Sequence, residues 1–334
     1  MYNISKTVII MAQHFLLSAK ARTLSLVAVM RLSDDEAYET FKAIRWASNG
    51  GEAVCPRCGC VEVYSYRARR IFKCKGCEAQ FSVTTDTIFA SRKMSIRDLL
   101  AAIAIFVNGA KGISALQLSR DLDCQYKTAF VLAHKLREAM GAEQAGVNLR
   151  GEVEVDGAFF GGYIKPENRK EDRVDRRRKE NQNGKRHAVV IMRERKGRSV
   201  PFVAQDEGDA VSTIIERIEA GSIVYADEAS CWDIFHSRFL TKRINHSVAY
   251  RDEDACTNQA ESFFSRLRRM EVGTHHHVSG RYLHQYANEA AWREDHRRED
   301  NGTQFERVVG AALAHSVSRE WKGYWQRSVG RHNI

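Results

Sequence analysis

The stretch GEVEVDGAFFGGY, residues 151–163, alternates apolar and acidic residues and ends in a glycine pair. Side chains alternate across a strand, so Val153 and Val155 fall on one face, whereas Glu154 and Asp156 fall on the other. The stretch therefore predicts a strand over residues 152–160 that buries its valine face and carries Asp156 toward its end.

The next segments continue an α/β pattern. RHAVVIMRER and SVPFVAQDEG predict two further strands, and AVSTIIERIEAG predicts an amphipathic helix. SIVYADEASCWDIF then predicts an apolar strand that delivers Asp227. Three strands, a helix, a strand and later helices are the order of an RNase H-like α/β fold. In that fold, acids at the ends of two adjacent strands converge with a third acid from a helix.

A third acid stands in TNQAESFFSRLRR, residues 257–269, where every charged residue except Glu261 is arginine. Arg268 follows Glu261 by seven residues, which is about two helical turns and places both on one helix face. A single acid at a strand end is most simply a solvated side chain. Together, Asp156, Asp227 and Glu261 predict a site for two Mg²⁺ or Mn²⁺ ions that catalyses phosphoryl transfer, because these cations prefer oxygen ligands.

Two Cys-x-x-Cys pairs flank a β-rich segment upstream. Cys55 and Cys58 form the first pair, and Cys74 and Cys77 the second. This spacing is typical of a zinc ribbon, in which four thiolates hold one structural Zn²⁺ and leave no position for a substrate. Cys60 could compete as a ligand, and a redox pair is the alternative interpretation.

Residues 91–141 predict three helices, over 95–108, over 114–122 and from Gln125 onward, with a tight turn at Asp123. The last two have helix-turn-helix spacing. In that motif the second helix enters the major groove by its N-terminal residues. The residues predicted to contact DNA are Gln125, Tyr126, Lys127 and Thr128. A plain three-helix packing module remains the alternative.

Charge favours a polyanionic partner. The 334 residues contain 52 Lys and Arg against 42 Asp and Glu, for a net charge of +10. The polar run 165–187 includes Arg176, Arg177 and Arg178, which could bind phosphates or merely form a solvated loop. The most apolar stretch, residues 8–30, contains three ionisable side chains and predicts no membrane span. Clustered rather than scattered cysteines favour a reducing cytoplasm.

These patterns predict a multidomain α+β protein. The expected divisions are an N-terminal helical segment over 1–50, the ribbon over 51–90, the helix-turn-helix region over 91–145, the catalytic domain over 150–300 and a C-terminal helical segment over 301–334. A serine cap at Ser33, with Glu36 three residues later, begins a helix in the first segment. The late tryptophans Trp292, Trp321 and Trp325 are expected in the core.

The combination of CPRCG, VEVDGAFFGG, VYADEAS and TNQAESFFSRLRR resembles insertion-sequence transposases of the DDE type, specifically the ISXO-like branch with an N-terminal zinc ribbon. The resemblance covers nearly the whole chain. It implies that Asp156 and Asp227 are the two aspartates, that Glu261 is the third acid and that Arg268 stands where lysine is usual. Asn258 competes with Glu261 for the third position.

Two departures accompany this resemblance. Gly157 stands where relatives often have a second acid, and Cys256 stands where histidine is common.

The resemblance implies cleavage of one strand at the end of a mobile element, followed by attack of the 3′ hydroxyl on target DNA. It also implies a homo-oligomer on double-stranded DNA, because two element ends must be joined. Two alternatives stay open. One is a DNA-binding regulator with an idle centre, and the other is an RNase H-like nuclease that cuts without joining.

Overall fold

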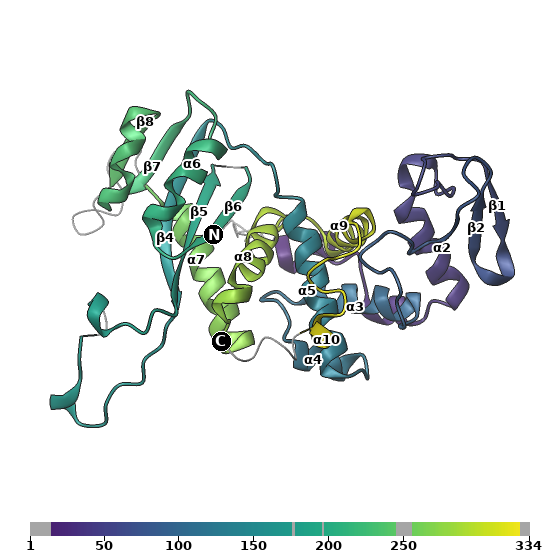
Figure 1. Ribbon diagram of the computed structural model, residues 1–334, viewed down its shortest axis with the longest axis horizontal. Helices are drawn as coiled ribbons and strands as arrows, with labels where there is room; N and C mark the ends of the chain where they lie inside the picture. Colours follow the sequence, from purple (N-terminus) through teal and green to yellow (C-terminus); the bar gives the residue numbers. More distant parts are fainter. Residues whose placement is uncertain (1–14, 176–177, 196, 245–255, 328–334) are drawn as a thin grey trace, which may run out of the picture.

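A computed structural model describes residues 15–175, 178–195, 197–244 and 256–327. A five-stranded sheet and a three-stranded ribbon lie at opposite ends of the molecule, with helices between them (Figure 1). The larger sheet contains β4 (Glu152–Gly161), β5 (Arg186–Glu194), β6 (Ser199–Ala204), β7 (Ile223–Asp227) and β8 (Leu240–Ile244). Its strand order is β6-β5-β4-β7-β8. The first three strands are antiparallel, whereas β4, β7 and β8 are parallel.

Four of the five strands agree with the expectations from sequence, and β8 was not predicted. Its sequence LTKRI has little apolar alternation, and Leu240 is 63% exposed. An edge strand buries little side-chain surface, so its sequence carries a weak signal.

Both faces of the large sheet are covered. Val153, Val155 and Met192 pack against α6 (Val211–Arg217) and the 3₁₀ segment Ser230–Ser237. On the opposite face, Ala158 and Ile191 pack against α7 (Asn258–Met270) and α8 (Gly280–Asp295). Asp156 is thus carried by a central strand between two apolar layers.

The ribbon consists of β1 (Val63–Tyr66), β2 (Ile71–Cys74) and β3 (Gln80–Ser82), in that order and antiparallel. It follows α1 (Leu26–Met30) and α2 (Asp34–Arg45). The expected cap at Ser33 is present as a capping box: the Ser33 hydroxyl accepts from Glu36 N, and the Glu36 carboxylate accepts from Ser33 N.

The three helices predicted over residues 91–141 are present. They are α3 (Ile96–Asn108), α4 (Ala115–Asp121) and α5 (Tyr126–Ala142). Ser95 caps α3 and Ser114 caps α4 through their side chains. Asp123, with a φ of 46°, makes the turn before α5 in the left-handed region that aspartate tolerates.

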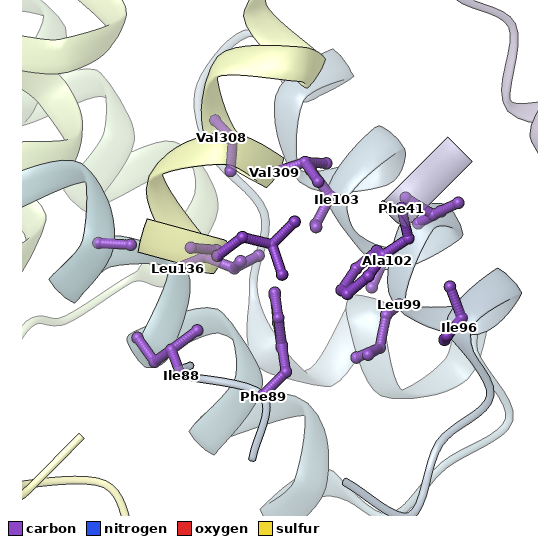
Figure 2. Packing of buried hydrophobic residues seen from close by; sticks show 14 of the residues in the cluster. Phe41, Ile88, Phe89, Ile96, Leu99, Ala102, Ile103, Leu136, Val308 and Val309 are labelled. Atoms are coloured by element: carbon purple, nitrogen blue, oxygen red, sulfur yellow. The ribbon is translucent and has the colours of Figure 1, made fainter. Parts of the chain in front are cut away.

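A single hydrophobic core joins segments that the sequence divides into four parts. Phe41 of α2, Leu99 and Ile103 of α3, and Leu136 of α5 meet Val308 and Val309 of α9 (Asn301–Ala314) (Figure 2). Apolar residues of the ribbon, including Phe72 and Phe81, extend the same core. The C-terminal helix α9 is therefore part of the N-terminal helical unit and not a separate appendage.

Helix α8 connects the two halves of the molecule. Trp292 near its C-terminus belongs to the helical core, whereas Leu283 and Ala287 belong to the core beneath the sheet. Within the described residues, none of the helices has both the length and the hydropathy that crossing a membrane requires.

Candidate active site and zinc centre

The register of the sheet places Asp156 and Asp227 on neighbouring strands. Val155 of β4 pairs with Ala226 of β7, and the two aspartates follow one residue later on each strand. Because the strands run parallel and in this register, the two aspartates lie side by side on neighbouring strands. Asp156 and Asp227 are both half-buried.

Helix α7 brings Glu261 and Arg268 to Asp156. All three residues line a hollow of about 490 Å³, together with Ser265 and Arg269. Glu261 and Arg268 are both exposed, as expected for two residues on one helix face that looks into an open hollow. The hollow is thus lined by both carboxylates and guanidinium groups.

Glu154, which the sequence did not single out as functional, fixes the start of α7. The helix has no side-chain cap of its own at Thr257. Instead, the fully buried Glu154 carboxylate accepts hydrogen bonds from Gln259 N at 2.8 Å and Ala260 N at 3.1 Å. A carboxylate at a helix N-terminus satisfies free N–H groups and interacts favourably with the helix dipole. Since Glu154 lies two residues before Asp156 on the same strand face, one strand positions both α7 and the site.

The pKa of Asp156 reflects its surroundings. Burial and the negative charges of Asp227, Glu207 and Glu261 together raise the pKa of this carboxyl to about 7, against a hydrogen bond from Gly157 N that lowers it. Desolvation and like charges both disfavour the ionised form. Such a crowded set of acids is a favourable environment for a compensating cation.

Glu207 is a fourth acid near Asp156, and no local sequence pattern marks it as functional. It begins the 3₁₀ segment Glu207–Ala210 between β6 and α6. A Cβ atom at Gly157 would lie 2.3 Å from Glu207 Oε1, so the Glu207 carboxylate occupies the space that a side chain at residue 157 would need. Burial raises the pKa of Glu207, as does the charge of Asp227.

Asn258, the competitor for the third position, is the first residue of α7 and is exposed. It does not line the hollow that contains Asp156 and Glu261. Cys256, the second departure from the resemblance, has its Sγ 3.1 Å from Arg195 Nη2. Arg195 also forms ion pairs with Glu152 and Glu154.

The four ribbon cysteines converge. The Sγ atoms of Cys55, Cys58, Cys74 and Cys77 all lie within 4.8 Å of one another. Four thiolates at this separation suit a closed tetrahedral zinc site. Cys60 stays outside this group, with its Sγ 3.7 Å from Glu62 O. Over the described parts of the chain, no three carboxylates are gathered as tightly, and the acids around Asp156 are spread more widely.

The residues predicted to contact DNA through α5 are accessible. Gln125, Tyr126, Lys127 and Thr128 are all exposed. Of the three arginines singled out in the polar run, Arg176 and Arg177 lie outside the described residues. Arg178 is exposed, and its Nη1 lies 3.6 Å from Glu180 Oε1. That run is part of a long arm between β4 and β5, which extends away from the sheet (Figure 1).

Comparisons with known proteins place two domains on the chain. Residues 148–295 match the ISXO2-like transposase domain, and residues 32–80 match the transposase zinc-ribbon domain. A protein of Halobacterium salinarum, described as an uncharacterized protein in transposable element ISH50, is 25% identical over 253 residues, which are 71% of this chain and 83% of that protein. No solved structure matches.

The zinc-ribbon match begins before the cysteines and includes α2, in agreement with the shared core of α2 and the ribbon. The transposase match spans β4 through α8 and therefore contains Asp156, Asp227, Glu261 and Arg268. The chain belongs to the insertion-sequence transposases that combine a zinc ribbon with an ISXO2-like transposase domain.

Proposed function

We propose that this transposase cuts one DNA strand at each end of its element and joins the resulting 3′ hydroxyl to target DNA, on an RNase H-like sheet that carries a DDE site. The observation that carries the proposal is the position of Asp156. It lies beside Asp227 of the adjacent strand, and it lines one hollow together with Glu261 and Arg268 of α7. The sheet order, with three antiparallel strands followed by two parallel ones, supports the fold assignment.

The donors at this site fit divalent magnesium or manganese. They are carboxylate oxygens, which are the hard ligands that Mg²⁺ prefers, and their mutual repulsion would be relieved by a cation. Asp156, Asp227 and Glu261 would hold the ions. When bound, a pair of such ions activates the attacking oxygen and stabilises the leaving oxygen of an in-line displacement.

The side chains of the chain itself bind and orient the DNA. Arg268 and Arg269 line the same hollow as Asp156 and Glu261, where their guanidinium groups can contact phosphate oxygens. Arginine at position 268 offers a fork of donors that a lysine lacks, so it can grip a phosphate by two hydrogen bonds. Water and then the 3′ hydroxyl serve as nucleophiles, so no serine or tyrosine is assigned that role.

The remaining parts serve recognition. The zinc ribbon and the start of α5 would bind the element ends, and joining two ends would require at least two copies of the chain. The closed set of four thiolates leaves the ribbon no open ligand position for chemistry.

Incubation of purified protein with Mg²⁺, a labelled element end and a target plasmid tests this function. We expect nicked and joined products from the wild-type protein. Asp156→Asn, Asp227→Asn and Glu261→Gln should each reduce cleavage by at least about 10²-fold and leave DNA binding intact, because each removes a negative charge needed to hold the cations. Double variants should be scarcely worse than single ones, since the acids act as a unit.

Asn258→Ala is the matched control on the same helix and should retain cleavage. Loss of cleavage in Asn258→Ala with retention in Glu261→Gln would transfer the third position to Asn258. Cleavage without joined product would identify a nuclease, and specific DNA binding without any cleavage would identify a regulator.

A further inference from the structure

We infer that a groove beside α5 binds the phosphate backbone of duplex DNA, and that the C-terminal segment of the chain forms one of its walls. The inference rests on the proposed function and adds a site to it. Three segments form most of this groove: residues 89–94, which lead from the ribbon to α3, the first turns of α5, and residues 321–326. Leu99 of α3 completes the lining. Its volume is about 650 Å³. We call it the α5 groove.

The charge of the α5 groove is entirely positive. Five cationic side chains line it, and among the described residues no aspartate or glutamate does. These cations are Arg92, Lys93, Lys127, Lys135 and Lys322. They come from all three lining segments, so the fold and not a local run of basic residues creates the cluster. A surface of this kind attracts a polyanion.

Residues 321–326, which form the C-terminal wall of the groove, pack against α5. Trp321 is buried, and its ring stacks on His134 of α5 at 4.3 Å between ring centres. Trp325, which the sequence predicts in the core, is instead half-buried at the groove. Its Nε1 donates to Lys127 O at 3.3 Å, and its ring centre lies 5.3 Å from Lys127 Nζ. The segment is thereby fastened to the first turn of α5 and holds Lys322 beside it.

Three of the cations are available for a ligand. Lys93, Lys127 and Lys322 are exposed, and within the described residues none of them forms an ion pair with a carboxylate. By contrast, Lys135 Nζ donates to Ile88 O at 2.8 Å, and Arg92 donates to Met94 O. A lysine ammonium acts as a point charge, which suits phosphates better than the directional reading of bases.

The groove also places possible base-reading side chains beside these cations. Gln125 and Thr128 line it at the start of α5, where a recognition helix presents its residues to the major groove. Phosphate contacts fix the register of a protein on DNA, whereas contacts to base edges give specificity. We therefore assign backbone binding to Lys93 and Lys322, and base contacts to Gln125.

The test compares Lys93→Ala with Lys322→Ala, singly and together, in full-length protein. Binding of an element-end duplex and an unrelated duplex is measured by fluorescence anisotropy across a range of salt concentrations. Each lost phosphate contact should reduce the steepness of the plot of log binding constant against log salt concentration by about 0.9. It should weaken binding of both duplexes equally. Gln125→Ala should instead reduce the preference for the element end with little change in slope.

Lys20→Ala is the matched control, because Lys20 is an exposed lysine that does not line the groove. An unchanged slope in the double variant, or a change no larger than in Lys20→Ala, would overturn the inference and would indicate that the groove binds an acidic protein instead.

A cleavage assay distinguishes failure of this inference from failure of the proposed function. If the wild-type protein cuts and joins DNA while the double variant binds with the wild-type slope, only the groove assignment fails. If the wild-type protein neither binds nor cuts DNA, the proposed function itself fails.

Discussion

At the scale of single residues, the ionisation of Asp156 depends on its neighbours. Burial and the charges of Asp227, Glu207 and Glu261 raise the pKa of Asp156 to about 7. Glu207→Gln removes one of these charges at nearly constant volume, so the pKa of Asp156 should fall and its carboxylate should persist to lower pH. Carboxyl ¹³C NMR titration of the metal-free protein measures this directly. We expect a midpoint near 7 in the wild type and a lower midpoint in the variant.

Glu216→Gln is the control for this titration. Glu216 is an exposed acid on α6, whose charge does not contribute to the raised pKa of Asp156. An equal change of midpoint in both variants would mean that the general loss of negative charge, and not the proximity of Glu207, controls Asp156.

The acids near Asp156 differ in whether the sequence alone could identify them. Asp156 and Asp227 could be nominated because each follows apolar strand residues, which is a local pattern. Asp227 is the last residue of β7 as expected, but Asp156 lies in the middle of β4, which continues to Gly161, because the apolar residues Ala158 and Phe160 extend the strand. Glu207 follows a strand in the turn sequence QDEG, where acids are ordinary. Only the packing of that turn against Gly157 brings it to the site, and no spacing along the chain encodes this proximity.

At the scale of elements, the ribbon depends on its ligands. Cys74→Ser should abolish zinc binding and unfold the ribbon, because ligand binding and folding are coupled in small metal sites. Cys60→Ser should retain the metal, because the Cys60 Sγ lies outside the group of four. Zinc content by atomic emission and limited proteolysis of residues 55–82 measure the two effects. Normal zinc content in Cys74→Ser, or its loss in Cys60→Ser, would require a different ligand set.

Local sequence predicted the starts of three helices whose caps are local. Ser33, Ser95 and Ser114 each cap the helix that follows them, and all three helices begin as expected. Helix α7 differs because its capping carboxylate, Glu154, comes from a strand about a hundred positions earlier. The alternation of β4 placed Glu154 on the face of Asp156, but its partner could be identified only once the sheet and helix were assembled.

At the scale of the whole molecule, a buried ionic network joins the helical unit to the transposase domain. Arg137 of α5 donates to Glu289 of α8 at 2.6 Å, and both side chains are at most 2% exposed. Arg293, one turn later on α8, donates to the other Glu289 oxygen at 2.9 Å and to Phe106 O at the end of α3 at 2.7 Å. Burial raises the pKa of Glu289, but the two arginines outweigh it and the net pKa is lowered. Helix α8 is thereby tied to α3 and α5 by charges that water cannot screen.

Removal of the central charge of this network should therefore destabilise the protein strongly. Glu289→Gln keeps the shape of the side chain but leaves the buried Arg137 and the half-buried Arg293 without this counter-charge. Breaking a buried ion pair costs about 3–5 kcal/mol in comparable cases. The free energy of unfolding in urea, followed by circular dichroism, measures the loss. Glu62→Gln is the surface control, because its pair with Lys75 is 70% and 45% exposed, and such pairs contribute at most about 1 kcal/mol. Equal small losses in both variants would show that the Glu289 carboxylate is compensated by solvent, and that apolar packing around Trp292 alone holds α8 to the helical core.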